Sequence, residues 1–428
     1  MKIFRSLSDE DLRFTLKPVV ALLVTASFAA IVPAHADQSN QLFSLEPVVQ
    51  RQKMQAQAFG RLAKMLSEPT SAELRLVSVR SSVIEKTMQE ITVPIADNKT
   101  ATFRQRKFES TNGGLLVWSG DAPSNRKDRY KWPNEVDFDP LNNATFVRDG
   151  SKLTGTLRVD GQLYSLKALE NGRHVIIKMD ESKFLPEAKP ILSGAPGQES
   201  TAGRITAAHS TIRVMIVTTN QARAEDPNLN ASITQALTVA NQANASSGAD
   251  ITFELAAVVD QNYNESGEQT DMLGQIRDLT DSGLGAPVAQ ARDLYRADLV
   301  VMILATSGAC GTGYLNATKA NAFSVVNYSC LDAKSLPHEM GHNIGLQHNW
   351  EEGNAIPTPS YRHGYRQQVA NPKFRTIMSY NCTGGCPRLD YWSNPNRTYQ
   401  GLPMGTAQYH DAVRRINERR EIVENFYP

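Results

Sequence analysis

The 428-residue sequence has few cysteines and almost no net charge, and each of these features excludes some classes of protein. Its 45 lysines and arginines nearly balance 44 acidic residues, so a formal charge of +1 gives no reason to expect nucleic acid or another polyanion as partner. Four cysteines are too few for a disulfide-dense scaffold. Beyond the N-terminus we see no apolar run long enough to span a membrane. With 41% hydrophobic and 21% charged residues the chain resembles a globular protein, so its function must be sought in local motifs.

Residues 1–36 have the pattern of an export signal. Lys2 and Arg5 lie in a basic segment before the apolar run 18–33, and Ala34-His35-Ala36 is a small-x-small cleavage site. The run is shorter than the roughly 20 residues of a spanning helix, so we expect cleavage rather than a membrane anchor. The mature chain is then expected to be secreted, without a membrane span, in a compartment where cysteines oxidise.

Residues 37–205 are expected to form a separate, mainly β region. Apolar spacing predicts a helix over residues 43–68, and residues 98–185 alternate as strands do. Asp160-Gly161 is a two-residue hairpin signal between two such strands. Residues 186–210 are rich in Pro, Gly and Ser, which predicts a flexible, exposed linker.

Residues 206–428 have an α/β pattern. Continuous apolar runs predict strands at 212–217, 251–259, 299–304 and 323–327. Helical spacing predicts helices at 230–245, 270–279, 286–295 and 406–426, with Asn230 as an N-cap of the first.

One eleven-residue segment reads His338-Glu-Met-Gly-His-Asn-Ile-Gly-Leu-Gln-His348, and it is the one highly specific motif in the chain. His338 and His342 are four residues apart, so on a helix both imidazoles lie on one face and reach one metal ion. Glu339 lies beside that face, where its carboxylate can reach a water on the metal. Gly345 permits the sharp turn that brings His348 back as third ligand. Three neutral imidazoles leave a fourth position open, which is typical of catalytic zinc.

The alternative reading is three surface histidines and a helix glutamate. It is disfavoured because three of only eight histidines fall within this segment, at ligand spacing.

The motif resembles that of the metzincin zinc endopeptidases, H-E-x-x-H-x-x-G-x-x-H followed by a methionine turn. The second part matches Thr376-Ile-Met378-Ser-Tyr380, thirty residues after His348. The resemblance covers residues 212–428 and is to bacterial-type secreted members, near the reprolysin-like and peptidyl-Asp metalloendopeptidase groups. Supporting similarities are Cys310-Gly-Thr-Gly-Tyr-Leu315 and Tyr391-Trp-Ser-Asn-Pro395.

The resemblance implies a fold and a mechanism. The fold is α+β, with a twisted, mostly parallel sheet, an active-site helix, a Met-turn and a C-terminal helix, preceded by a mainly β propeptide. The mechanism is hydrolysis of peptide bonds by water activated on one catalytic Zn²⁺, with Glu339 as general base. Met378 would lie beneath the metal, and Tyr380 would ligate it at rest and stabilise the oxyanion. A core methionine and a packed aromatic are the plain alternatives for these two residues.

Two positions depart from the family pattern. Asn349 follows the third histidine, where reprolysins have Asp and astacins Glu. Pro337 directly precedes His338, and proline is tolerated only in a first helical turn. We therefore expect the active-site helix to start late, capped by Ser335, or to kink.

All four cysteines lie in the second half of the chain. We expect the pairs Cys310–Cys330 and Cys382–Cys386, one of three possible connectivities. Thiolate metal ligands are a weaker alternative, because no second C-x-x-C pair is present.

The chain is then expected to be a zymogen: a signal at 1–36, a propeptide at 37–205 that inhibits the enzyme, and a peptidase at 206–428. A cysteine switch is excluded, because no cysteine precedes Cys310. Trp118-Ser-Gly-Asp121 is similar to the aromatic-x-Gly-Asp segment of astacin propeptides, where Asp blocks zinc; a plain Gly-Asp turn is the alternative.

Two other functional classes remain at this stage. A non-catalytic zinc-binding or adhesive exoprotein would not need Glu339. A thermolysin-type peptidase would use a downstream Glu in place of His348.

Substrates are expected to be proteins or peptides, and the sequence is silent on calcium. Basic residues cluster around the Met-turn, and one of them could favour an acidic residue after the scissile bond: Arg362, Arg366, Lys373, Arg375 and Arg388. A solvated basic face is the alternative. His363, between the two motifs, could line the cleft or be structural.

Overall fold

The computed structural model describes residues 38–49, 53–55, 58, 60–192, 206–306, 308–351 and 358–428. The expected export signal at 1–36 lies outside these residues. The compact unit from Ser39 to Pro428 contains two large β-sheets, each with its own hydrophobic core.

An antiparallel sheet occupies the N-terminal half of the described chain, as expected for a mainly β region. Nine of the described strands follow the order β1-β2-β9-β8-β7-β6-β5-β4-β3. At the predicted hairpin, Asp160 and Gly161 have φ of 50° and 83°, the left-handed conformation that a two-residue turn requires. The strands are β1 (Phe43–Leu45), β2 (Ser71–Val79), β3 (Glu90–Ala96), β4 (Lys99–Ser110), β5 (Leu116–Asp121), β6 (Asn143–Asp149), β7 (Lys152–Val159), β8 (Gln162–Ala168) and β9 (His174–Met179).

The start of this region differs from the expected helix over 43–68. Phe43–Leu45 is strand β1, paired with β2, because Phe43 is buried in the sheet core rather than on a helix face. Helix α2 is shorter, spanning Gly60–Ser67. A one-turn helix, α3 (Arg126–Arg129), lies between β5 and β6.

The second sheet is the mixed sheet of a three-layer α/β unit. Its order is β10-β14-β15-β13-β11-β12, in which β12, β11, β13 and β15 run parallel and β14 is antiparallel to β15. All four predicted strands are present. The strands are β10 (Ile191–Leu192), β11 (Ser210–Thr218), β12 (Ile251–Asp260), β13 (Leu299–Leu304), β14 (Gly311–Leu315) and β15 (Phe323–Asn327).

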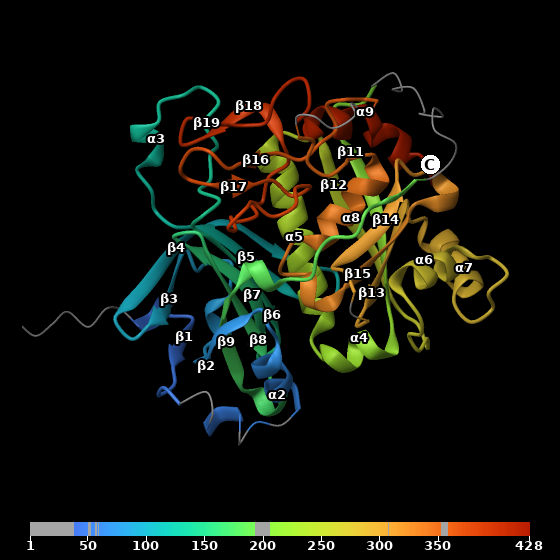
Figure 1. Ribbon diagram of the computed structural model, residues 1–428. Helices are drawn as coiled ribbons and strands as arrows, with labels where there is room; N and C mark the ends of the chain where they lie inside the picture. The colour runs from blue at the N-terminus through green and yellow to red at the C-terminus, as the bar shows by residue number, and fades with distance from the viewer. Residues whose placement is uncertain are drawn as a thin grey trace, which may run out of the picture. The chain divides into compact units, whose positions relative to one another are not determined.

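Helices cover both faces of this sheet. Ile212, Val214 and Ile216 of β11 pack in one core with helices α5, α8 and α9, while Met215 and Val217 face the other core with α6 and α7. Figure 1 shows α5 and α8 running beside these strands. The helices are α4 (Asn220–Glu225), α5 (Leu229–Ser247), α6 (Gln269–Arg277), α7 (Gly285–Tyr295), α8 (Ser335–Ile344) and α9 (Ala412–Glu424).

Helix α5 begins one residue before the expected cap, so Asn228 rather than Asn230 is its N-cap. Two small hairpins lie between α8 and α9: β16 (Arg366–Gln367) with β17 (Phe374–Arg375), and β18 (Asn394–Tyr399) with β19 (Leu402–Met404). The disulfides Cys310–Cys330 and Cys382–Cys386 are both formed, as predicted.

The expected linker is partly ordered. Residues 193–205 are outside the description, but Pro186 and Ala188 form backbone hydrogen bonds with Cys310 and Gly311, and β10 pairs in parallel with β14. The composition predicted an exposed linker because it carries no information about pairing with a strand more than 100 residues away in the sequence.

Candidate metal centre

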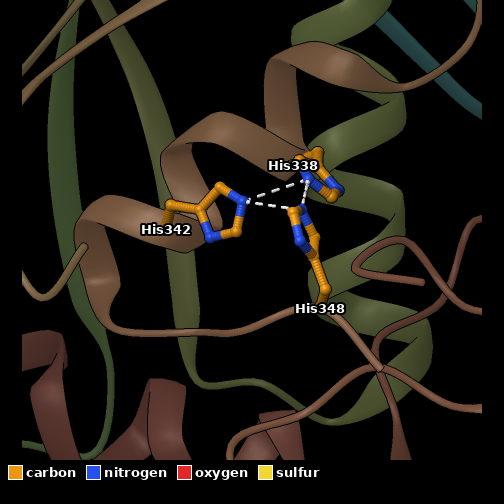
Figure 2. A group of neighbouring side chains, drawn as sticks. All are labelled: His338, His342 and His348. Atoms are coloured by element: carbon orange, nitrogen blue, oxygen red, sulfur yellow. Dashed lines mark hydrogen bonds between the residues drawn. The ribbon is translucent and has the colours of Figure 1, made fainter. Parts of the chain in front are cut away.

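Helix α8 carries two of the predicted ligands, and the turn after it carries the third. His338 and His342 lie on the helix one turn apart. Gly345 ends the helix at φ 112°, a conformation that side chains other than glycine rarely adopt. The chain reverses there, and Figure 2 shows His348 returning to face the other two imidazoles.

The three histidines converge on one point. Their Nε2 atoms are 3.0 Å apart for His338 and His348, 3.1 Å for His338 and His342, and 3.2 Å for His342 and His348 (Figure 2). Tetrahedral ligands at the zinc–nitrogen bond length of about 2.0–2.1 Å lie roughly 3.3 Å apart. The triad therefore has nearly the spacing that a zinc ion requires.

Contacts on the far side of two rings orient them. Nδ1 of His338 is 2.9 Å from the carbonyl oxygen of Ile377, and Nδ1 of His342 is 2.8 Å from that of Leu346. A carbonyl only accepts, so Nδ1 of His342 carries a proton and its Nε2 presents a lone pair. Nδ1 of His338 also lies 3.0 Å from Nη2 of Arg388, a group that only donates, so the two contacts do not fix the tautomer of that ring. The His342 lone pair points toward the two other Nε2 atoms, 3.1 and 3.2 Å away, where a metal ion between the three rings would accept it. The donor set therefore fits a metal ion.

Burial keeps these histidines neutral. It lowers the pKa of His342 to about 4, and it lowers the pKa of His338 and His348 well below the usual value, with help from neighbouring histidines and Arg388. Neutral imidazole is the form that binds metal.

Glu339 points its carboxylate into a space with no partner. Both oxygens are buried and make no hydrogen bond within the described part of the chain. Burial, reinforced by the charge of Glu187 and partly offset by Arg388, raises the pKa of Glu339 well above its usual value. The carboxylate fits because strand β14 has glycine beside it: an added Cβ at Gly311 would lie 2.7 Å from Glu339 Oε1.

The predicted Met-turn lies against the triad. Met378 is buried in the core that contains Met340 of α8, and the carbonyl before it, of Ile377, is the one that anchors His338. The Tyr380 ring is half-buried, with its centroid 4.1 Å from that of His348. Burial and the negative charges of Glu187 and Glu339 raise the pKa of Tyr380.

The two departures from the family pattern now have structural accounts. Asn349 accepts a hydrogen bond from the backbone N–H of Tyr380 (3.0 Å), so it ties the third-ligand turn to the Met-turn. Pro337 lies in the first turn of α8, where proline is tolerated. The expected Ser335 cap is wrong: Lys334 is the N-cap, and the Ser335 hydroxyl instead donates to Glu187 (2.8 Å).

Two residues at the site were not identified as a pair from the sequence. Glu187 comes from the expected linker, and a carboxylate oxygen of it lies within 4.8 Å of ligand atoms of His338 and Glu339. Arg388 donates to Glu187 Oε1 at 2.6 Å, while the other Glu187 oxygen is buried without a partner. Arg388 was one of five candidate basic residues, but no local signal connects positions 187 and 388.

The other candidates lie elsewhere. Asp121 forms an ion pair with Arg106 (2.5 Å), and burial raises its pKa to about 6; the acidic group beside the triad is Glu187 instead. His363 is buried with its Nδ1 2.7 Å from the His348 carbonyl oxygen, so it is structural. Among the basic residues, Arg366 pairs with Glu351 and Lys373 is exposed.

Comparisons with known proteins agree with this geometry. The model of metallo-peptidase family M12, of reprolysin type, matches residues 208–393. A peptidyl-Asp metalloendopeptidase of Xanthomonas campestris pv. campestris is 35% identical over 369 residues, covering 84% of this chain and 87% of that protein. The chain belongs to the peptidyl-Asp metalloendopeptidase family. A member from Stenotrophomonas maltophilia is 32% identical over 395 residues, covering 89% of this chain and 93% of that protein.

Membership in this family confirms the resemblance drawn from the two motifs, and it makes the chain a metalloendopeptidase. The reading as a non-catalytic exoprotein is therefore set aside. The crystal structure of metalloproteinase-II from Bacteroides fragilis matches with a TM-score of 0.40 and 12% identity over 62% of this chain and 83% of that one, a likeness too slight to carry an argument. Among the described helices, none is both long and apolar enough to cross a membrane.

Proposed function

We propose that this metalloendopeptidase is a secreted zinc enzyme, made as a zymogen, in which Glu339 is the general base. The observation that carries the proposal is the convergence of three Nε2 atoms within 3.0–3.2 Å, with the far side of two of the rings beside backbone carbonyl oxygens. Imidazole ligands in this number suit zinc with an open position.

His338, His342 and His348 would hold the ion. When bound, zinc supplies Lewis-acid polarisation of the peptide carbonyl and a water acidic enough to ionise near neutral pH. The protein residues supply proton transfer and orientation. Glu339 has free carboxylate oxygens beside the triad, so it can take a proton from water and pass it to the leaving amine. The Tyr380 hydroxyl, next to His348, can donate a hydrogen bond to the developing oxyanion.

The zymogen part of the proposal rests on the segment at 186–192. Its backbone occupies the outer edge of β14, the edge where an extended substrate would add as a further strand. It also brings Glu187, with one free oxygen, beside His338 and Glu339. We therefore infer a signal at 1–36, a propeptide at 37–205 that blocks the site, and a peptidase at 206–428. Export also accounts for the two disulfides.

Glu339→Gln tests the catalytic role. We expect it to keep the metal and to reduce cleavage of casein by the matured enzyme by on the order of 10²–10⁴-fold, because the amide cannot accept the proton. Glu254→Gln, at an exposed position of β12, is the matched control and should cleave normally. Mass spectrometry of the secreted protein should give a mature N-terminus near residue 206. An active Glu339→Gln enzyme would contradict the assignment of the base.

A further inference from the structure

Arg388 is a buried cation whose carboxylate partner comes from outside the peptidase region. Its side chain is 3% exposed, and its Nη1 donates to Glu187 Oε1 at 2.6 Å and to the Ala333 carbonyl oxygen at 2.8 Å. Its Nη2 lies 3.0 Å from Nδ1 of His338, so the guanidinium is adjacent to a predicted metal ligand. Within residues 206–428, as far as the structure describes them, it has no ion-pair partner.

A second cation lies in the same cavity. A pocket of about 250 Å³ beside the triad is lined by Glu187, Arg375, Tyr380 and Arg388, among others. Arg375 is buried and donates to the Ser379 carbonyl oxygen at 2.7 Å, but among the described residues it has no ion-pair partner. The nearby Arg158 is already paired with Glu181. The pocket therefore has two guanidinium groups, those of Arg375 and Arg388, and two carboxylates, that of Glu187 and that of Glu181, which is paired with Arg158.

Glu181 and Glu187 both precede residue 206, so their joint removal would leave both cations without a carboxylate in this pocket. Glu187 belongs to the segment that pairs with β14 and that leaves with the propeptide under the proposed maturation. A buried charge that loses its partner is strongly unfavourable, so the emptied pocket favours a replacement carboxylate. An extended substrate on β14 could present one from the same place.

We propose that Arg388 is the specificity-determining residue of this enzyme, that its guanidinium binds the acidic side chain of the substrate residue next to the cleaved bond, and that Glu187 occupies this acid-binding pocket in the intact chain. Arg375 supplies additional positive charge. The inference rests on the proposed peptidase function and gives a structural basis for the name of the relatives.

The test compares two peptides that differ only in one residue, Asp or Asn, in an otherwise neutral sequence. The matured wild-type enzyme should prefer the Asp peptide by on the order of 100-fold or more in kcat/KM, because Asn leaves the buried guanidinium uncompensated. In Arg388→Gln the ratio should fall towards one, with zinc content equal to that of the wild type. Mass spectrometry identifies the bond cleaved.

Arg366→Gln is the matched control, because Arg366 lies near the Met-turn but does not line the pocket; it should keep the wild-type ratio. Arg388→Lys keeps the charge without the paired donors, so we expect an intermediate ratio, about tenfold lower than wild type. If the Gln variant does not fold, the Lys variant provides the test. An unchanged Asp-to-Asn ratio in both Arg388 variants would overturn the inference. A wild-type enzyme that cleaves neither peptide nor casein would instead refute the proposed function.

The role of Glu187 is tested in the intact chain, with Glu339→Gln to prevent self-cleavage. Hydrogen exchange at residues 311–315 should become faster when Glu187→Gln is added, since the segment loses its ionic anchor beside β14. Adding Glu254→Gln should change nothing. Equal exchange rates with and without Glu187→Gln would show that Glu187 is not what holds the segment in the pocket.

Discussion

Glu339 and the ligand histidines are buried polar groups, and the described chain does not supply partners for all of their polar atoms. Two carboxylate oxygens lack a hydrogen-bond partner, and three Nε2 atoms face one another at 3.0–3.2 Å. Such atoms cost free energy in a folded protein unless a ligand or ion completes them. The ligands could be predicted from the sequence because their spacing is local. The pair Glu187 and Arg388 could not, because 201 residues separate them.

Gly311→Ala tests how closely Glu339 is held. The added Cβ would lie 2.7 Å from Cγ and Oε1 of Glu339 and 2.8 Å from the Val325 carbonyl oxygen. Because these contacts are too short, we expect a loss of about 1–3 kcal/mol in the free energy of unfolding and lower activity.

The control is Gly274→Ala in helix α6, where an added Cβ meets nothing within 4 Å. It should be neutral or stabilise by up to about 1 kcal/mol, measured by thermal unfolding. Equal stability of the two variants would argue against the close packing of Glu339 on β14.

At the scale of elements, strand β14 positions the site, yet its residues were not predicted. The strands predicted correctly have continuous apolar runs, such as Leu299–Leu304, which is fully buried. Strand β14 reads Gly-Thr-Gly-Tyr-Leu, and glycine has low strand propensity. Its glycines instead leave room for the Glu339 side chain beside the strand, and pairing with β15 holds the segment in an extended conformation. Pairing with β15 thus outweighs the low strand propensity of this segment.

The two disulfides should differ in their effect on stability. Cys310–Cys330 joins the residue before β14 to the 3-10 turn after β15 and spans 20 residues, whereas Cys382–Cys386 spans four. Loop-closure entropy gives about 3 kcal/mol for the first and about 2 kcal/mol for the second. Denaturant unfolding of the Cys→Ala pairs, Cys310/Cys330 and Cys382/Cys386, measures this. A larger loss for the second pair would contradict the entropic account.

At the scale of the whole molecule, the near-zero net charge hides a network of buried ions between the N-terminal sheet and the peptidase. Asp332 accepts a hydrogen bond from Ser165 (2.7 Å) and pairs with Lys167 (2.9 Å), and Arg158 donates to the Arg388 carbonyl oxygen (3.3 Å). The composition showed that positive and negative charges balance. It could not show that positive groups beside the site are matched by a carboxylate from the proposed propeptide.

The measurement that tests the central claim most directly is the zinc content of the purified protein, by mass spectrometry of the metal, in wild type, Glu339→Gln and His348→Ala. We predict one zinc per chain in the first two and a large loss in the third, because only His348→Ala removes a ligand. A wild-type protein without zinc, or a His348→Ala variant that binds it as tightly, would contradict a catalytic zinc centre at this triad.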